Sequence, residues 1–337
     1  MPDSSWLDWP FYEDRHRALK RELDAWAAAN ATLLDAHDPD LDAQCRALAR
    51  ALGDAGWCRY AVPQAYGGAL ERLDVRSIAI LRETLAYHSG LADFVLAMQG
   101  LGSGAITLFG TEAQKQRWLP RMARGELIGA IAMTEPGAGS DLQGVRTRAV
   151  LEGDHYRING SKIFITNGGQ ASLLMLVTRT NTEDRKRGLS LIMVETENLP
   201  GYRVGRVLDK MGMPAQDTAE LFFEDVRVPA DCRLGPEEGL GMQQLMGDLP
   251  YERLVIALCG VAAMEGAVAE TSKYVKERKA FGQVIGQMQH IRFKLAECAT
   301  VTRVARVFVD DCIVKLLRGE LDTATASMAK YWVTDMQ

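Results

Sequence analysis

The spacing of apolar residues changes twice along this chain, and that change constrains the fold more than any other feature. From Trp9 to about Gly125, apolar residues recur at the spacing of helices. From about Leu127 to Cys232, short runs typical of strands replace that pattern, and from about Gly239 onward the helical spacing returns. Helices, then strands, then helices predict an α+β fold rather than alternating strand–helix units.

The two helical regions divide into separate helices. The expected helices cover 77–88, 91–109, 251–279, 288–316 and 322–337. Thr111 and Gln114 form a capping-box pattern that opens one more helix. Apolar residues from Met288 through Cys298 to Leu316 mark one face of the long helix expected over 288–316. Gly319 follows it, where a glycine commonly ends a helix.

The middle region is rich in short β-type runs. They cover 128–133, 146–151, 155–158, 162–166, 173–178, 189–194 and 220–228. The pair Asn159-Gly160 between two of these runs favours a hairpin turn. Short strands without long helices between them predict an antiparallel sandwich or barrel. We therefore expect an N-terminal helical domain over 1–126, a middle antiparallel β domain over 127–234 and a C-terminal helical bundle over 235–337.

Composition excludes several classes of protein. The chain has 337 residues, of which 47% are apolar and 25% charged, enough to bury a core without disulfides. A net charge of −5 argues against a broad nucleic-acid or membrane surface. The six cysteines form no C-x-x-C pair and no cluster with histidines, so we expect no metal site and a reducing, cytoplasmic compartment. We find no signal peptide and no run as long as a membrane span, and expect no membrane insertion.

Two glycine-rich stretches are candidates for a cofactor site. Gly100-Leu-Gly-Ser-Gly104 approaches the dinucleotide-binding pattern, but it lies inside a helical pattern and does not follow a strand, which argues against that role. The stretch from Thr134 to Asp141 follows an apolar strand, and its glycines let main-chain N–H groups approach an anion or a ring. From these residues alone, an ordinary β-turn is the simpler interpretation.

Four segments, in order, resemble the signature segments of the acyl-CoA dehydrogenase family. They are 129–144, 159–168, 210–229 and 277–282, the last followed by Gln289. The sequences of residues 215–220 and 251–254 are most similar to those of the long-chain branch of this family. The resemblance implies an N-terminal helical domain, a middle β domain and a C-terminal four-helix bundle. It also implies FAD as cofactor and dehydrogenation of an acyl-CoA thioester to the trans-2-enoyl-CoA.

The resemblance assigns one part of the flavin site to the β region. The main chain of Met133 and the residues Thr134 and Thr166 match positions that hydrogen-bond the flavin. Phe164 matches an aromatic position beside the ring, where many relatives carry Trp; by alternation alone it is an ordinary strand aromatic. Ser140 matches a position near both the pyrophosphate and the thioester arm of the substrate.

A second part of the cofactor site falls in the C-terminal region. Arg278, Phe281 in the same segment, and Gln289 match a stretch that reaches the FAD of a neighbouring subunit. The planar guanidinium of Arg278 suits a pyrophosphate because it donates paired, charged hydrogen bonds. Without the resemblance, Arg278 is a cation at a solvated helix end, which the helix dipole favours.

The proposed reaction needs a positioned carboxylate in a dry site, because the α-proton of a thioester is weakly acidic. The resemblance assigns this base to Glu252 and places Tyr251 and Arg253 along the CoA and thioester region, while flavin N5 takes the β-hydride. From the residues alone, Glu252 is an acid in a first helical turn. Family members continue beyond Gln337, so we expect an incomplete bundle whose absent part contains the alternative place for the base.

Three functions remain open on the sequence. The leading one is a dehydrogenase that passes electrons to an electron-transfer flavoprotein and assembles as a homo-oligomer, a dimer or tetramer. A flavin oxidase or monooxygenase of the same fold is an alternative, and a non-catalytic acyl-thioester or flavin binding protein is another. The presence of Glu252, Thr134, Thr166 and Arg278 argues against the last. The sequence does not determine the acyl chain length.

Overall fold

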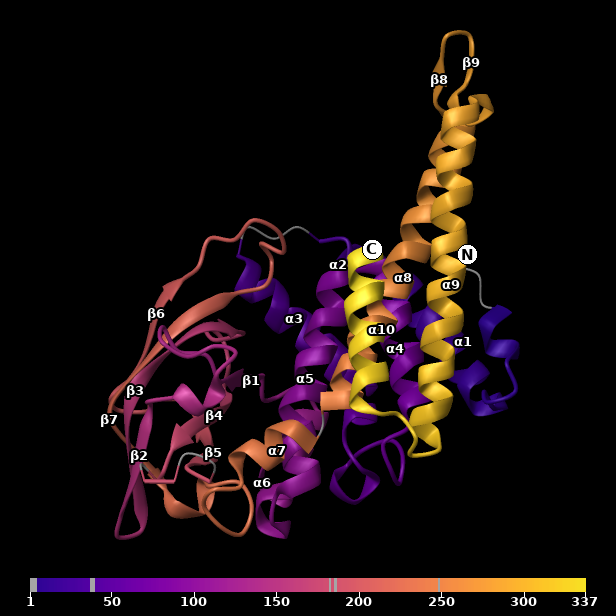
Figure 1. Cartoon of the computed structure of the whole chain (residues 1–337). Coiled ribbons are helices and arrows are strands. Elements are labelled where there is room, and N and C mark those ends of the chain that lie inside the picture. The colour runs from indigo at the N-terminus through magenta and orange to yellow at the C-terminus, as the bar shows by residue number, and fades with distance from the viewer. Residues whose placement is uncertain (1–4, 37–39, 182, 185–186, 248) are drawn as a thin grey trace. The chain divides into compact units, whose positions relative to one another are not determined.

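The computed structural model describes residues 5–36, 40–181, 183–184, 187–247 and 249–337. The chain divides into two compact units, each assembled from separated segments (Figure 1). The first, which we call the helical unit, contains the residues up to Asp35 and the segments Asp74–Asp93 and Leu249–Gln337. The second, the sheet unit, contains Ala36–Leu73 and Phe94–Asp248. The division by chain order into 1–126, 127–234 and 235–337 stays a prediction.

Five helices pack side by side in the helical unit. They are α1 (Asp14–Ala29), α4 (Val75–His88), α8 (Leu249–Glu277), α9 (Gln289–Leu317) and α10 (Thr323–Met336). Helices α4, α9 and α10 all contact α8, and α1 contacts α4. Leu258, Val309 and Val333 are fully buried in its core. Asp74 and Asp322 cap α4 and α10 by accepting main-chain N–H bonds, so local sequence fixes where these helices begin.

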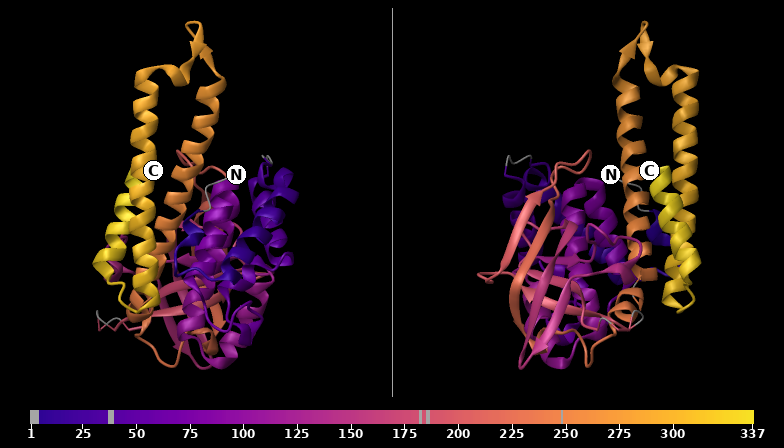
Figure 2. Two further views of the ribbon diagram at one scale, coloured as in Figure 1. Left: turned by 90° about the vertical axis from the view of Figure 1, so that its right-hand side faces the viewer. Right: turned by 60° about the vertical axis from the view of Figure 1, so that its left-hand side comes forward.

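A small hairpin joins α8 to α9 at one end of this helix pair (Figure 2). It consists of β8 (Lys279–Ala280) and β9 (Gln283–Val284), and Phe281 and Gly282 form its two-residue turn. Both turn residues have positive φ, 53° and 79°, as a type I′ turn requires. The predicted glycine at the end of α9 is confirmed, because Gly319 has φ 73° directly after the C-cap.

The buried face of α9 differs from the predicted one. No residue of α9 up to Thr300 is buried, and Cys298, predicted to lie on the inner face, is exposed. In the second half, Arg306 and Asp310 are buried beside Val309. Figure 1 shows α10 alongside only this second half, so the apolar stripe of the first half has less of the unit to pack against. Helical spacing alone does not show how much of a helix is covered.

Seven strands form one sheet in the sheet unit. They are β1 (Gly129–Ala132), β2 (Arg148–Glu152), β3 (His155–Thr166), β4 (Leu173–Arg179), β5 (Leu189–Glu195), β6 (Tyr202–Val207) and β7 (Thr218–Pro229). The order is β1-β4-β2-β3-β7-β6, with β5 also on β4. Strands β1 and β2 pair with β4 in parallel, so the sheet is mixed and the prediction of an antiparallel domain is wrong. In the described residues this strand path does not close into a barrel.

Strand β3 runs unbroken through Asn159 and Gly160, so the hairpin turn predicted there is wrong. The chain instead turns at Gly153, between β2 and β3. Gly160 lies where the pairing with β7 shifts, and a Cβ there would come within 2.5 Å of the Thr147 Oγ1. The glycine is therefore required by a close approach between strands rather than by a turn.

Helices α3 (Leu41–Asp54) and α6 (Glu112–Ala123) belong to the sheet unit, and α5 (Gly90–Phe109) crosses the boundary between the units. The capping box is confirmed, since Thr111 and Gln114 exchange the two expected hydrogen bonds. By length and composition, Gly90–Phe109 and Gly241–Glu277 are long and apolar enough to cross a membrane, so the statement that no run has that length is wrong. Of the apolar window in α5, 61% is buried within the protein, as in a core helix.

Candidate functional site

The end of β1 is fastened to β3 by two hydrogen bonds. The Lys162 Nζ donates to the main-chain oxygen of Met133 at 2.9 Å. The main-chain N–H of Ile163 donates to the main-chain oxygen of Thr134, also at 2.9 Å. Met133 and Thr134, two of the predicted flavin contacts, therefore lie directly beside the second half of β3.

The other two predicted flavin contacts of the sheet unit lie on that half of β3. The pairing with β7 shifts between Lys162 and Ile165, and this bulge turns Phe164 outward while both of those neighbours stay buried. Phe164 has φ 60° and is 61% exposed, and such backbone strain is typically retained at functional sites. Thr166, half-buried, ends the strand opposite Thr218. The structure thus brings together all four residues.

Glu135 follows directly, and its carboxylate points into the protein. It accepts hydrogen bonds from the main-chain N–H of Arg146 at 2.7 Å and of Thr147 at 2.8 Å, and from the Lys162 Nζ at 2.9 Å. Burial alone would raise the pKa of Glu135, but the Lys162 ammonium and these hydrogen bonds outweigh it and hold the pKa below its usual value. The negative charge of Glu135 is thereby balanced by the positive charge of Lys162.

The rest of the glycine-rich turn is open. Apart from the adjoining residues of the chain, no atom of the described residues lies within 4 Å of the positions that a Cβ would occupy at Gly137 and Gly139, and Ser140 is exposed. Together with the outward ring of Phe164 and the hydroxyl of Thr166, the residues from Gly137 to Ser140 offer an apolar wall, a hydroxyl and main-chain N–H groups. Such a set fits an isoalloxazine ring with its phosphate arm.

The predicted base lies in the helical unit. Tyr251, Glu252 and Arg253 form the first turn of α8, and all three are half-buried. The Arg253 Nη1 is buried and has no hydrogen-bond partner within the part of the chain that the structure describes. A buried guanidinium N–H without a partner costs free energy, so this group is suited to an anionic or carbonyl ligand.

The remaining predicted cofactor contacts lie together at the α8–α9 hairpin. Arg278 precedes β8, Phe281 forms the turn and Gln289 begins α9. All three side chains are exposed, and Phe281 is 95% exposed. The structure therefore groups the predicted residues into three sets, one in the sheet unit and two in the helical unit.

The prediction from sequence did not single out Lys162 or Glu135. A signal was present, because Tyr156, Ile158 and Lys162 fall on alternate positions of one strand and the first two are inward apolar residues. A lysine at such an inward-facing strand position is buried, and a buried lysine needs an acidic or hydrogen-bonding partner.

Family models match almost the entire chain. The N-terminal domain of acyl-CoA dehydrogenase matches residues 13–126, the middle domain 130–226 and the C-terminal domain 239–337. A crystal structure of acyl-CoA dehydrogenase from Geobacillus kaustophilus is 39% identical, with 97% of this chain and 86% of that chain covered at a TM-score of 0.87. The chain belongs to the acyl-CoA dehydrogenase family. The predicted resemblance and the order of helical and β parts are confirmed.

Two further relatives bear on what this acyl-CoA dehydrogenase family member does. The mitochondrial long-chain specific acyl-CoA dehydrogenase of Mus musculus is 47% identical over 266 residues, which is 78% of this chain and 61% of that protein. A solved structure described as the electron transferring flavoprotein of Acidaminococcus fermentans is 34% identical, covers 98% of this chain and 86% of its own, and has a TM-score of 0.87. Acyl-CoA dehydrogenases are FAD flavoproteins, which agrees with the open glycine-rich turn that follows β1.

Proposed function

We propose that this protein is a FAD-dependent acyl-CoA dehydrogenase that converts an acyl-CoA thioester to the trans-2-enoyl-CoA. The observation that carries the proposal is the convergence of Met133 and Thr134 with the outward Phe164 and with Thr166 around the β3 bulge. When bound, FAD would take up the hydride lost from the β-carbon, a redox step that no side chain supplies.

The sheet unit would hold the flavin through uncharged groups. The main chain of Met133 and the hydroxyls of Thr134 and Thr166 would hydrogen-bond the ring, and Phe164 would cover one face and exclude water. Ser140 lies on the open glycine-rich turn and would serve the pyrophosphate and the thioester arm. Because Glu135 is turned inward and paired, these contacts add no negative charge beside the ring.

In the helical unit, Glu252 would remove the α-proton of the substrate. Its half-buried place in the first turn of α8 supports this role, because a general base must be held in position by the protein and still be within reach of its substrate. The Nη1 of Arg253, which has no hydrogen-bond partner among the described residues, would bind an oxygen of the CoA or the thioester, beside Tyr251.

Four finer features belong to the same proposal. The 47% identity to a long-chain relative supports a long acyl chain, and the likeness to a structure described as an electron transferring flavoprotein supports such a flavoprotein as electron partner. The exposed Phe281 and Phe293 support a homo-oligomer in which Arg278 and Gln289 reach a neighbouring FAD. All six cysteines are free thiols, which supports a reducing cytoplasmic compartment.

The test combines cofactor binding with turnover. The purified chain should bind FAD and lose its visible flavin absorbance when saturated acyl-CoAs of increasing length are added without oxygen. Glu252→Gln should bind FAD but bleach far more slowly, while Glu270→Gln, an exposed acid on the same helix, should behave like the wild type. A protein that binds no FAD would contradict the proposal, and normal bleaching by Glu252→Gln would remove the base role from that residue.

A further inference from the structure

Lys162 is a buried cation that the proposed chemistry does not use. Its side chain is 0% exposed, although lysine is almost never fully buried. Burial lowers the pKa of Lys162 to about 8, against the attraction of Glu135, so the ammonium is maintained at neutral pH at some cost in stability. Replacing a buried ion pair by apolar groups is often neutral or stabilising, so stability alone does not account for this pair.

The bonds of this pair join three separate stretches of main chain. The Lys162 Nζ bonds the Met133 oxygen at the end of β1 and the Glu135 carboxylate, each at 2.9 Å. Glu135 in turn accepts from the main-chain N–H groups of Arg146 and Thr147, just before β2. One ammonium and one carboxylate therefore link the main chain on both sides of the segment 136–145, and the ammonium links it to β3.

The strand that carries Lys162 also carries the outward aromatic. Lys162 is the last residue before the register shift, and Phe164 lies within it. Lys162 thus ties the main chain at Met133 to the strand segment that carries Phe164, and in the proposed function both face a common ligand.

We propose that Lys162 and Glu135 are positioning residues for the flavin. They hold the main chain at 133–134 against the β3 bulge without touching the cofactor themselves. The inference rests on the proposed function, and it adds that FAD affinity depends on the hydrogen bond from Lys162 to Met133 and not only on the balance of charge inside the sheet unit.

The alternative is that the two residues merely neutralise each other. Lys162→Met alone leaves the Glu135 carboxylate buried without its cation, so it lowers stability under either account. The double variant Lys162→Met with Glu135→Gln leaves no unpaired charge but still lacks the donor to the Met133 oxygen. Neutralisation predicts that the double variant regains both stability and FAD affinity, whereas positioning predicts that it regains stability alone.

The experiment uses the full chain and measures two quantities. Thermal unfolding of the apoprotein reports stability, and quenching of flavin fluorescence together with the visible flavin spectrum reports FAD binding. We expect the double variant to unfold near the wild-type temperature and to bind FAD about tenfold more weakly or worse, the effect of one lost charge-assisted hydrogen bond. Its flavin spectrum should also shift, because the ring environment changes.

A matched control variant distinguishes the loss of the Lys162 hydrogen bond from a general loss of stability in the sheet unit. Thr178→Val removes a fully buried hydroxyl in β4, which donates to the Ser190 oxygen of β5 at 3.2 Å and so belongs to neither the glycine-rich turn nor β3. It should lower stability with no change in FAD affinity. A double variant with wild-type affinity and spectrum, or a Thr178→Val variant that weakens FAD equally, would overturn the inference, whereas a wild-type chain without FAD binding would overturn the proposed function as well.

Discussion

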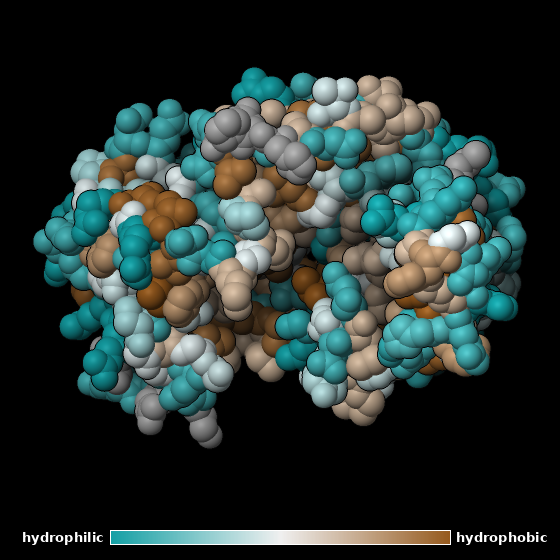
Figure 3. Space-filling view, turned by 90° about the horizontal axis from the view of Figure 1, so that it is seen from above, coloured by the Kyte–Doolittle hydropathy of each residue, from teal (hydrophilic) through white to brown (hydrophobic). Residues whose placement is uncertain are grey.

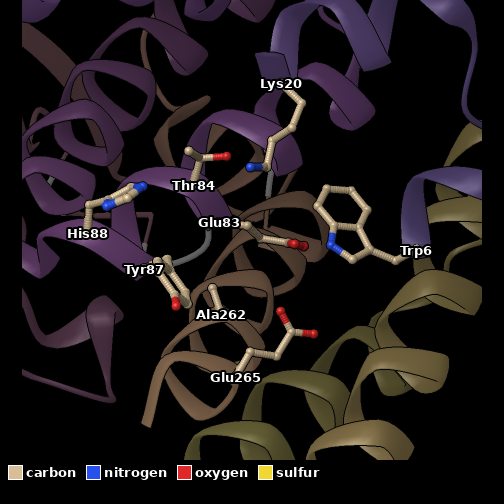
Figure 4. A pocket seen from close by; sticks show the side chains of 8 residues that line it. All are labelled: Trp6, Lys20, Glu83, Thr84, Tyr87, His88, Ala262 and Glu265. Carbon is tan, nitrogen blue, oxygen red and sulfur yellow. The ribbon is translucent and has the colours of Figure 1, made fainter. Parts of the chain in front are cut away.

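At the residue scale, the helical unit contains a cluster of buried charges around one guanidinium. Arg306 donates to both oxygens of Glu83 at 2.8 Å and to Glu265 at 3.1 Å, and lies 3.8 Å from Asp310. Glu83 and Glu265 also line a cavity of about 20 Å³ together with Trp6 (Figure 4), which has room for about one water. Three carboxylates share one cation here, so the cluster carries an excess of negative charge when all are ionised.

Asp310 is the member of this cluster that should titrate near neutrality. Burial raises its pKa to about 7, Arg306 only partly offsets this, and Glu83 and Glu265 add to it. Neither carboxylate oxygen of Asp310 has a hydrogen-bond partner within the described residues. Since an unfolded aspartate ionises near pH 4, the folded state loses stability as the pH rises from about 4 to about 7 and does not recover it above that range.

Asp310→Asn should therefore stabilise the protein, and more so at higher pH. We expect its gain in unfolding free energy over the wild type to grow by roughly 2–3 kcal/mol between pH 5 and pH 8, measured by chemical denaturation. Asp311→Asn, one residue further and exposed, should show no such growth. An equal gain at both pH values would mean that Asp310 is already ionised in the folded protein.

At the element scale, the packing of β3 depends on Gly160, because there is no space for a side chain at this position. A Cβ at Gly160 would lie 2.5 Å from the Thr147 Oγ1 and 2.7 Å from the Thr147 Cα. An alanine there therefore forces β3 away from the segment that contains Thr147. Gly160→Ala should lower the unfolding free energy by about 2 kcal/mol or more, measured by urea denaturation.

The matched change is Gly153→Ala in the turn between β2 and β3. Gly153 has positive φ, 63°, but apart from the adjoining residues no atom in the part of the chain that the structure describes lies within 4 Å of its Cβ position. This variant should lose only the conformational term, roughly 1 kcal/mol. Equal losses at both glycines would show that crowding against Thr147 plays no part.

Helices were more predictable from the sequence than the sheet, for a physical reason. A capping box such as Thr111 with Gln114, or a terminal glycine such as Gly319, is a local interaction, so neighbouring residues determine it. Strand pairing depends on residues far apart in sequence. The parallel pairing of Gly129–Ala132 with Leu173–Leu176 and the continuity of β3 through Gly160 have no local signature.

In the candidate site, too, features that depend on pairing between distant residues were less predictable than local ones. Phe164 and Thr166 were predictable only through the resemblance of short motifs, because an outward aromatic on a strand is usually an ordinary surface residue. The bulge that makes Phe164 unusual comes from pairing with β7, which the sequence does not reveal. Strand alternation marks Lys162 as buried, but its partner Glu135 lies twenty-seven residues earlier in the chain, so the pair has no local signature.

At the scale of the whole molecule, apolar side chains reach the surface. Figure 3 shows hydrophobic residues among hydrophilic ones on the face seen from above. Phe281, at the α8–α9 hairpin, is 95% exposed, an unfavourable arrangement for an isolated chain in water. This side chain is suited to burial in another subunit.

Phe281→Ser should reduce the oligomeric mass without unfolding the protein, because it removes apolar contact area from an exposed turn. Sedimentation velocity should show a multiple of the chain mass for the wild type and a smaller species for the variant. Leu151→Ser, at an exposed apolar position on β2, serves as the control and should leave the mass unchanged. A wild-type protein that sediments as a single chain would contradict this prediction.

The most direct test of the account is one anaerobic turnover of the FAD-loaded protein with a saturated acyl-CoA, followed by mass spectrometry of the thioester. The account predicts bleaching of the flavin together with an enoyl-CoA product that has two hydrogens fewer than the substrate. An unchanged thioester beside fully oxidised, tightly bound flavin would contradict it.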